Sequence, residues 1–423
     1  MASKNQSNSK SVKKQRLVFG VSFPVFLMGL VSLFTDISSE SIQSILPLFI
    51  IEIGGNILVL GLISGITNAI ANVLKGITGW MSDKINKRKP FIVAGYSLSN
   101  LSKPLIGLSP SWGMVLGLKT ADRIGKGLRT SSRDTLISYY ATKKGKAFGL
   151  HRAMDTLGAV FGSLLAFLLL FLAWSYSQII FFSIIPGLIA VALLLPVKDV
   201  SPEELDKKLK RKNLKEKMEK IDRNFIKLIV ILGVIEFASL DVVFLILRAR
   251  DYIPLDLIYL IPVFYLILNI VYTIFSPING SLSDKFGRKP IIIIGLSILL
   301  LSCVILAFPV EVSLFSVVLI IIIYIMHGFY LASVDPISRA YIADLAGKEK
   351  RGRAYGYYYS SVGFIGMSEA LVFGFIYSVF NFTWAFIYIS ILLAVCIVIF
   401  AITDFSKIVK KGEVILHFTG FQL

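Results

Sequence analysis

Long apolar runs separated by short charged segments recur along all 423 residues of the chain. The clearest runs cover 291–310, 314–332 and 386–402, where charged residues are almost absent. About 20 apolar residues carry a helix across the ~30 Å hydrocarbon layer of a bilayer, so each run predicts a transmembrane helix. The pattern predicts twelve such helices, at 17–51, 57–82, 90–109, 112–140, 147–172, 178–196, 225–249, 256–282, 290–309, 312–343, 353–380 and 383–403.

Composition supports a membrane protein and excludes several other classes. Hydrophobic residues make up 55% of the chain and charged residues only 17%, which lies outside the usual range of soluble domains. A water-soluble enzyme, a secreted disulfide scaffold and a disordered protein are therefore excluded. The sequence contains neither a Walker A phosphate loop nor a metal-ligand spacing, so we expect no enzymatic activity, no cofactor and no metal site.

Basic residues predict the orientation of the chain. Lys and Arg gather in alternate flanks, for example 83–89, 198–227 and 345–353, whereas the opposite flanks hold Arg248 and Arg250. Because cytoplasmic loops carry the excess of Lys and Arg, both termini are predicted to be cytoplasmic in a multi-pass protein of the plasma (inner) membrane. This topology accounts for the formal net charge of +18, and no nucleic-acid partner is expected.

The sequence repeats at half its length. The segment that begins at Gly79 and continues through Asp83 recurs from Gly280 through Asp284, and the same offset maps Glu40 onto Asp241. Two six-helix halves of equal orientation follow, related by an axis along the membrane normal. We predict an all-α polytopic membrane protein with these segments: a disordered cytoplasmic N-terminus (1–16), an N-terminal bundle (17–197), a cytoplasmic linker (198–224), a C-terminal bundle (225–403) and a cytoplasmic tail (404–423).

The repeated motif resembles the G-x-x-x-D-[RK]-x-G-[RK]-[RK] signature of the major facilitator superfamily. The second copy is complete, and the first has Asn86 in place of the last glycine. The segment from Arg123 to Gly127 is similar to the family's R-x-x-Q-G element, with Lys126 in place of Gln. The resemblance implies a central site lined by spans one, four, seven and ten, with alternating access by rocking of the two halves.

The two motif loops are candidate gates. Asp83 can cap a helix or pair with an arginine on a neighbouring helix, which would lock one conformation. Candidate partners are Arg133 in span four and Arg339 in span ten. The alternative is that the loops serve topology alone. The gating residues predicted are Gly79, Asp83, Lys84, Lys87, Arg88, Gly280, Asp284, Lys285, Gly287, Arg288 and Lys289.

Charged residues inside the predicted spans mark a candidate pathway. A charge at the bilayer centre costs about 2.5–3.5 kcal/mol on insertion scales, so such residues face a cavity or a partner. In span four, Lys119, Arg123 and Lys126 lie along one side of the helix. We predict that these three line a cavity, with ion pairs to Asp122 or Asp36 as the alternative.

Acidic residues occupy spans one, seven and ten. Asp36 and Glu40 share one helix face, and Glu40 is expected to face its repeat equivalent Asp241 across the axis. A carboxyl in a cavity of low dielectric can load and release a proton near neutral pH, which makes proton coupling possible. The alternative is that Asp36 neutralises Arg123. The remaining candidates are Glu236, Asp335 (expected at a helix break caused by Pro336) and Glu369, which is either a coupling acid or a packed, protonated one.

The features together predict a secondary active transporter that works by alternating access. The leading hypothesis is proton-coupled efflux of a small organic compound. Uptake or exchange of an organic anion is the first alternative, because basic residues outnumber acids inside the first-half spans. A transport-dead membrane sensor is the second alternative, disfavoured because large soluble sensing domains are absent. Expected partners are a small-molecule substrate, protons and the lipid bilayer, and we expect the chain to act as a monomer.

Overall fold

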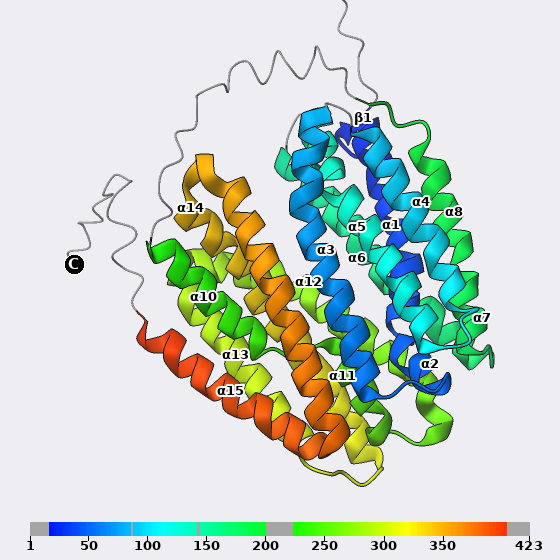
Figure 1. Ribbon diagram of the computed structural model, residues 1–423, viewed down its shortest axis with the longest axis vertical. Helices are drawn as coiled ribbons and strands as arrows, with labels where there is room; N and C mark the ends of the chain where they lie inside the picture. The colour runs from blue at the N-terminus through cyan, green and yellow to red at the C-terminus, as the bar shows by residue number, and fades with distance from the viewer. Residues whose placement is uncertain (1–16, 86–87, 142–143, 200–222, 404–423) are drawn as a thin grey trace, which may run out of the picture.

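The computed structural model describes residues 17–85, 88–141, 144–199 and 223–403. Apart from a two-stranded hairpin, β1 (Leu17–Val18) and β2 (Val21–Ser22), these residues form helices and their connections. The helices gather into two bundles that stand side by side (Figure 1). The predicted terminal segments 1–16 and 404–423, and most of the linker, lie outside the described residues.

The first six spans form the N-terminal bundle. Its first span is interrupted after Gln43, because Pro47 has no backbone N–H for the carbonyl one turn earlier and its ring crowds that carbonyl. The fourth span is helix α5, and it has the predicted bounds, 112–140. The helices are α1 (Phe23–Gln43), α2 (Leu46–Glu52), α3 (Ile57–Ile85), α4 (Lys89–Ile106), α5 (Trp112–Tyr140), α6 (Lys144–Phe171), α7 (Tyr176–Phe182) and α8 (Ile184–Leu194).

The last six spans form the C-terminal bundle. Its first span is also interrupted, between Phe237 and Val242, and Asp241 caps the second piece by accepting a hydrogen bond from the backbone N–H of Val243 at 3.0 Å. The elements are α10 (Arg223–Phe237), α11 (Val242–Ala249), the 3₁₀ turns η1 (Arg250–Tyr252) and η2 (Leu255–Leu260), α12 (Ile261–Phe286), α13 (Arg288–Leu306), α14 (Leu314–Val379) and α15 (Phe382–Ile402).

Helix α14 contains two predicted spans in one element of 66 residues. A straight helix of that length would be about 100 Å long, whereas Figure 1 shows α14 folding back on itself as two arms. The predicted loop at 345–353 is therefore wrong, since the backbone stays helical there. The predicted break at Pro336 is also wrong, because this proline lies inside the continuous first arm.

The fold class predicted from the sequence is confirmed. Ten described helices are long and apolar enough to cross a membrane, and α4 and α5 complete the twelve spans. The charges of α5 explain why it lacks a typical hydropathy signal. Apolar side chains on the outer faces of the bundles, such as Leu188, Ile391 and Val395, are exposed, as contact with lipid requires.

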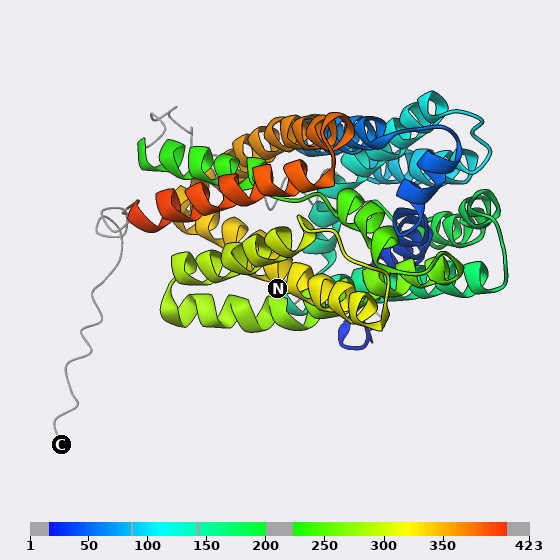
Figure 2. The same cartoon turned by 90° about the horizontal axis from the view of Figure 1, so that it is seen from below.

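The two bundles meet along α3 and the second arm of α14, which lie against each other in both views (Figures 1 and 2). Glycines make this contact possible. A Cβ atom on Gly61 would collide with the backbone carbonyl of Ala370, and a Cβ atom on Gly65 would lie 3.0 Å from the backbone of Met367. Figure 1 shows the two helices diverging toward the end of the molecule at which α3 and α8 end, and approaching each other at the opposite end. We call that opposite end the linker-distal end.

Candidate functional site

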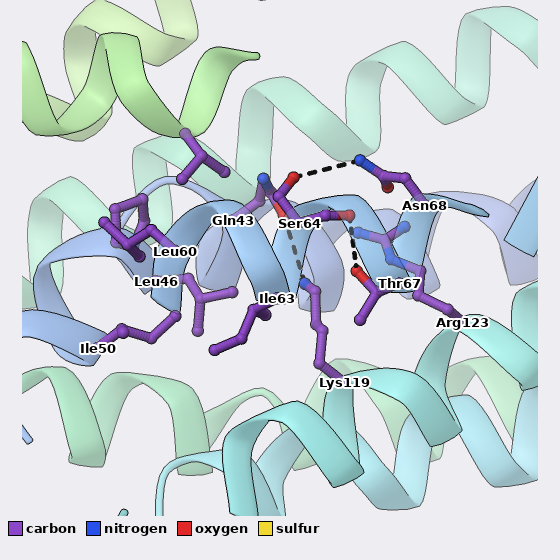
Figure 3. Close-up of a pocket in the computed structure, with 12 residues that line it drawn as sticks. Gln43, Leu46, Ile50, Leu60, Ile63, Ser64, Thr67, Asn68, Lys119 and Arg123 are labelled. Carbon is purple, nitrogen blue, oxygen red and sulfur yellow. Dashed lines mark hydrogen bonds between the residues drawn. The ribbon is translucent and has the colours of Figure 1, made fainter. Parts of the chain in front are cut away.

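A pocket lies inside the N-terminal bundle between α1, α2, α3 and α5, and Val243 of α11 also borders it (Figure 3). It contains about 330 Å³ of space free of atoms, part of it continuous with solvent. One end is polar and the other is apolar. The polar lining consists of Gln43, Ser64, Thr67, Asn68, Lys119 and Arg123, and the apolar lining of Leu46, Pro47, Ile50, Leu60, Ile63 and Val243.

Two cations of α5 provide the positive charge of the pocket. The Lys119 side chain donates a hydrogen bond to the side-chain oxygen of Gln43 at 3.3 Å, a neutral acceptor. The Nε atom of Arg123 lies 3.8 Å from the carboxylate of Asp122, which is too long for a hydrogen bond. Asp122 instead accepts the hydroxyl of Ser99 at 2.5 Å. The guanidinium of Arg123 therefore reaches the pocket without a hydrogen-bonded carboxylate among the described residues.

Lys126, one turn farther along α5, is half-buried. Within the described part of the chain its carbonyl accepts the hydroxyl of Thr130, but its ammonium makes neither a hydrogen bond nor an ion pair. Asp36 of α1 lies within electrostatic range of Lys126 and Glu40, but no direct ion pair joins Asp36 to Arg123 among the described residues. The alternative in which Asp36 directly neutralises Arg123 is therefore not the arrangement seen in the structure.

Glu40 and Asp241 each bind a hydroxyl of the opposite half. The carboxylate of Glu40 accepts the hydroxyl of Tyr265 on α12 at 2.7 Å. The carboxylate of Asp241 accepts the hydroxyl of Ser64 on α3. The two acids thus make separate contacts across the boundary between the halves, and that they face each other stays a prediction.

The acids of the C-terminal bundle lie near one another, because Glu236 is within electrostatic range of both Asp335 and Asp241. Glu236 and the 3%-exposed Glu369 lie within electrostatic range of each other and of Asp241, and Oε1 of Glu369 has no hydrogen-bond partner in the described structure. Asp335 belongs to a polar chain: it forms an ion pair with Arg339 at 2.5 Å and accepts the hydroxyl of Tyr272 at 3.0 Å.

That polar chain continues into the other half. The guanidinium of Arg152 on α6 donates to the hydroxyl of Tyr272 at 3.1 Å. Where α3 contacts the second arm of α14, the ammonium of Lys75 lies 5.0 Å from the ring centre of Tyr359 and within electrostatic range of Asp335 and Arg339. Contacts between a cation of the N-terminal bundle and a tyrosine of the C-terminal bundle therefore occur both between α6 and α12 and between α3 and α14.

The first motif loop is described only in part. The structure describes only the backbone of Gly79, Asp83 and Lys84, at the end of α3. Lys87 lies outside the described residues. The backbone N–H of Arg88 donates to the carboxylate of Asp199 at 3.2 Å, at the base of α4.

The second motif loop is a compact turn. Gly287 has a φ of +94°, which explains the glycine of the motif, and Asp284 pairs with Arg288 on the following helix. The ammonium of Lys289 donates to the carbonyls of Ala401 and Thr403, at 2.6 and 2.9 Å, and so ties α13 to the end of α15. Of the two remaining predicted residues, Lys285 lies over the ring of Phe286 and Gly280 faces open space.

The two predicted gate partners bind carboxylates of their own helices. Arg133 pairs with Asp134 at 3.0 Å and donates to the hydroxyl of Ser32 at 3.2 Å, which ties α5 to α1. Arg339 pairs with Asp335 one turn earlier in α14. Pairing of these two arginines with the motif aspartates therefore stays a prediction, to be sought in another conformation.

Sequence reasoning missed Ser64, Tyr265 and Gln43, which are neutral and bear no charge signal. The internal repeat could have indicated two of them. The offset that maps Glu40 onto Asp241 also maps Ser64 onto Tyr265.

Twelve spanning helices in two repeats, with ionisable side chains around an internal pocket, define a polytopic membrane transporter rather than an enzyme. The sequence profile of the Major Facilitator Superfamily matches residues 28–271 and 254–414. The chain therefore belongs to the major facilitator superfamily and is a secondary transporter of small molecules, which confirms the family and the class predicted from the sequence.

Relatives among known proteins share most of the chain. An uncharacterized MFS-type transporter of Methanocaldococcus jannaschii is 34% identical over 382 residues, covering 89% of this chain and 92% of the relative. An uncharacterized protein of Mycobacterium tuberculosis is 25% identical over 393 residues, with the same coverage. Multidrug resistance protein 2 of Bacillus subtilis is 37% identical, but over 92 residues, which is 21% of this chain and 22% of that protein.

Solved structures share the fold at low sequence identity. A mutant of the nucleoside transporter NupG superposes with a TM-score of 0.76 at 13% identity, covering 89% of this chain and 99% of that one. A POT family transporter crystallised with a thioalcohol-conjugated peptide gives a TM-score of 0.74 at 13% identity, covering 92% and 97%. These similarities establish the architecture. The class of substrate has to be inferred from the residues of the site.

Proposed function

We propose that this transporter carries a small organic anion with an apolar portion. The observation that supports the proposal is the pocket in Figure 3, where Lys119 and Arg123 lie in one lining with an apolar wall of Leu46, Ile50 and Leu60. Arg123 has the carboxylate of Asp122 nearby, at 3.8 Å and without a hydrogen bond. A substrate carboxylate, sulfonate or phosphate would supply the hydrogen-bonded counter-charge that a buried cation needs. Arginine binds such groups through two parallel hydrogen bonds, which fixes their orientation.

Lys126 extends the positive surface by one turn toward the other end of α5. Its ammonium has no hydrogen bond or ion pair within the described structure, so it offers a second site for the anion along a transport path. The apolar wall favours a substrate with a hydrocarbon or aromatic body over a small inorganic anion. This selects the organic-anion alternative as the best-supported substrate class.

Proton coupling is the second part of the proposal. Glu40 lies within electrostatic range of Lys119 and Lys126 and also binds Tyr265 of the other half. A change in its protonation would act on both the cationic site and the contact between the halves. The flux assay described below distinguishes efflux, uptake and exchange. A transport-dead sensor would bind the anion without moving it across the membrane. The plasma membrane, cytoplasmic termini and a monomeric state stay predictions.

Reconstitution into liposomes tests the proposal. Aromatic and aliphatic carboxylates, organophosphates, sulfonates and cationic amphiphiles are offered in turn, with the acidic side inside, outside or absent. The proposal predicts saturable flux of an organic anion that depends on the pH gradient and is lost in Arg123→Ala. Acid outside the liposome drives symport, and acid inside drives exchange against protons. Flux of cationic amphiphiles with no flux of any anion would refute the substrate class.

A further inference from the structure

We propose that Ser64 and Tyr265 form a symmetry-related pair of hydroxyls that holds the linker-distal ends of the two halves together, and that the transport cycle must break both hydrogen bonds. The inference goes beyond the substrate proposal and depends only on the alternating access of a secondary transporter. Both residues belong to helices that had no predicted role in the site.

The first bond joins α12 to α1. Tyr265 is 7% exposed and donates its hydroxyl to Oε2 of Glu40 at 2.7 Å. Glu40 is held close to α6, because Gly162 leaves room for it: a Cβ atom on that glycine would lie 3.1 Å from the Cβ atom of Glu40. The acceptor is therefore fixed in the N-terminal bundle while the donor belongs to the C-terminal bundle.

The second bond joins α3 to the start of α11. Ser64 is 9% exposed and donates its hydroxyl to Oδ2 of Asp241. The other oxygen of Asp241 accepts the backbone N–H of Val243 at 3.0 Å. This helix cap orients the carboxylate, so that the second oxygen points at the opposite half without a free rotation of the side chain.

The two bonds are copies of each other. An offset of 201 residues maps Ser64 onto Tyr265, and the same offset maps Glu40 onto Asp241. In each case the acid comes from the first span of one half and the hydroxyl from the second span of the other half. The pseudo-twofold axis therefore exchanges the bonds, and each half supplies one donor and one acceptor.

Position along the helices shows what the bonds hold. Tyr265 lies in the first turns of α12, and Ser64 lies seven residues into α3, about 10 Å from its linker-distal end. Glu40 is in the last turn of α1, and Asp241 directly precedes α11. Hydrogen bonds of this length cannot survive a separation of the two halves by several ångströms, so both must break before this end can open.

Removal of the hydroxyls tests the proposal without knowledge of the substrate. A cysteine at Leu60, which is 1% exposed and borders the pocket, reports opening of the linker-distal end through its rate of labelling by a membrane-impermeant maleimide. The two native cysteines are buried and are replaced by alanine in the parent protein. Tyr265→Phe and Ser64→Ala are each expected to raise the labelling rate about tenfold, because each removes a hydrogen bond to a charged acceptor. The double variant is expected to exceed either single one.

We call the two hydrogen bonds together the latch. Matched controls separate the loss of the latch from a general loosening of the fold. Tyr324→Phe removes a buried hydroxyl that has no partner among the described residues, and Ser302→Ala removes one that bonds only within α13. Both controls are expected to label at the parental rate. Equal labelling of the test and control variants would overturn the latch, and an effect from only one of Ser64 and Tyr265 would overturn its symmetry. Because no transport is measured, failure here leaves the organic-anion proposal untouched, and failure of that proposal leaves the latch untouched.

Discussion

Replacement of Arg123 gives the most direct test of the pocket. Its guanidinium borders the pocket and lies 3.8 Å from Asp122 without a hydrogen bond to it. A bound carboxylate gains charge-assisted hydrogen bonds from arginine, with a net contribution of about 2–3 kcal/mol. At 1.4 kcal/mol for each factor of ten, Arg123→Ala is expected to weaken anion binding by about 30- to 150-fold.

The fold should tolerate this change. Asp122 keeps the hydroxyl of Ser99 at 2.5 Å and lies within electrostatic range of Lys103 and Lys119, so its charge is not left uncompensated. Arg123→Lys retains the positive charge but loses the planar fork, and a smaller loss of about tenfold is expected.

The assay measures anion affinity in two ways: the concentration dependence of flux in liposomes, and stabilisation of the detergent-solubilised protein by the anion in thermal unfolding. Arg250→Ala is the control, since it removes an exposed arginine beyond the end of α11. An Arg123→Ala protein that unfolds at the wild-type temperature and binds the anion with wild-type affinity would refute the assignment of the pocket.

Three further outcomes follow from individual contacts. Glu40→Gln should abolish the response of flux to an imposed pH gradient, because an amide exchanges no proton; an unchanged response in vesicles would remove Glu40 from coupling. Gly61→Val should hold α3 away from Ala370, so that flux falls at least tenfold while membrane insertion stays normal; wild-type flux would contradict the close packing of these helices. Arg248→Ala should lower stability by about 2 kcal/mol, since it leaves the carbonyls of Leu306 and Phe308 without the hydrogen bonds of this buried side chain and removes its contact with the ring of Phe382. Thermal unfolding in detergent checks this value, and a midpoint equal to that of wild type would show that the buried cation adds no net stability.

Hydropathy was sufficient to predict most of the spans, because bilayer thickness constrains the length of every apolar run. The bounds of α5 were predicted even though it is the most polar of the helices that the structure describes. The interruptions of spans one and seven were missed, since they depend on Pro47 in one case and on the capping side chain of Asp241 in the other. Such local backbone chemistry has little effect on an average over 20 residues.

The candidate site was predicted in outline and missed in its pairings. The repeat correctly paired Glu40 with Asp241 as equivalent positions, but it did not reveal that each bonds a neutral hydroxyl of the other half. The charge of a residue indicates that it needs a partner. It does not indicate which side chain the packing of the two bundles will bring close to it. Arg339 illustrates the same limit, because a carboxylate one turn away in the same helix, that of Asp335, is its ion-pair partner.

The two contacts between the halves differ in the groups that meet. Along α3 and α14, Gly61 and Gly65 bring backbone close to backbone. Beside α6, the rings of Phe167 and Phe171 pack against Tyr259, with ring centres 6.1 and 5.6 Å apart. Smooth backbone surfaces can rotate on each other with little repacking, whereas interleaved rings must slide apart. We therefore expect the ring contacts beside α6 to separate first, and the glycine contacts between α3 and α14 last, when the linker-distal end opens.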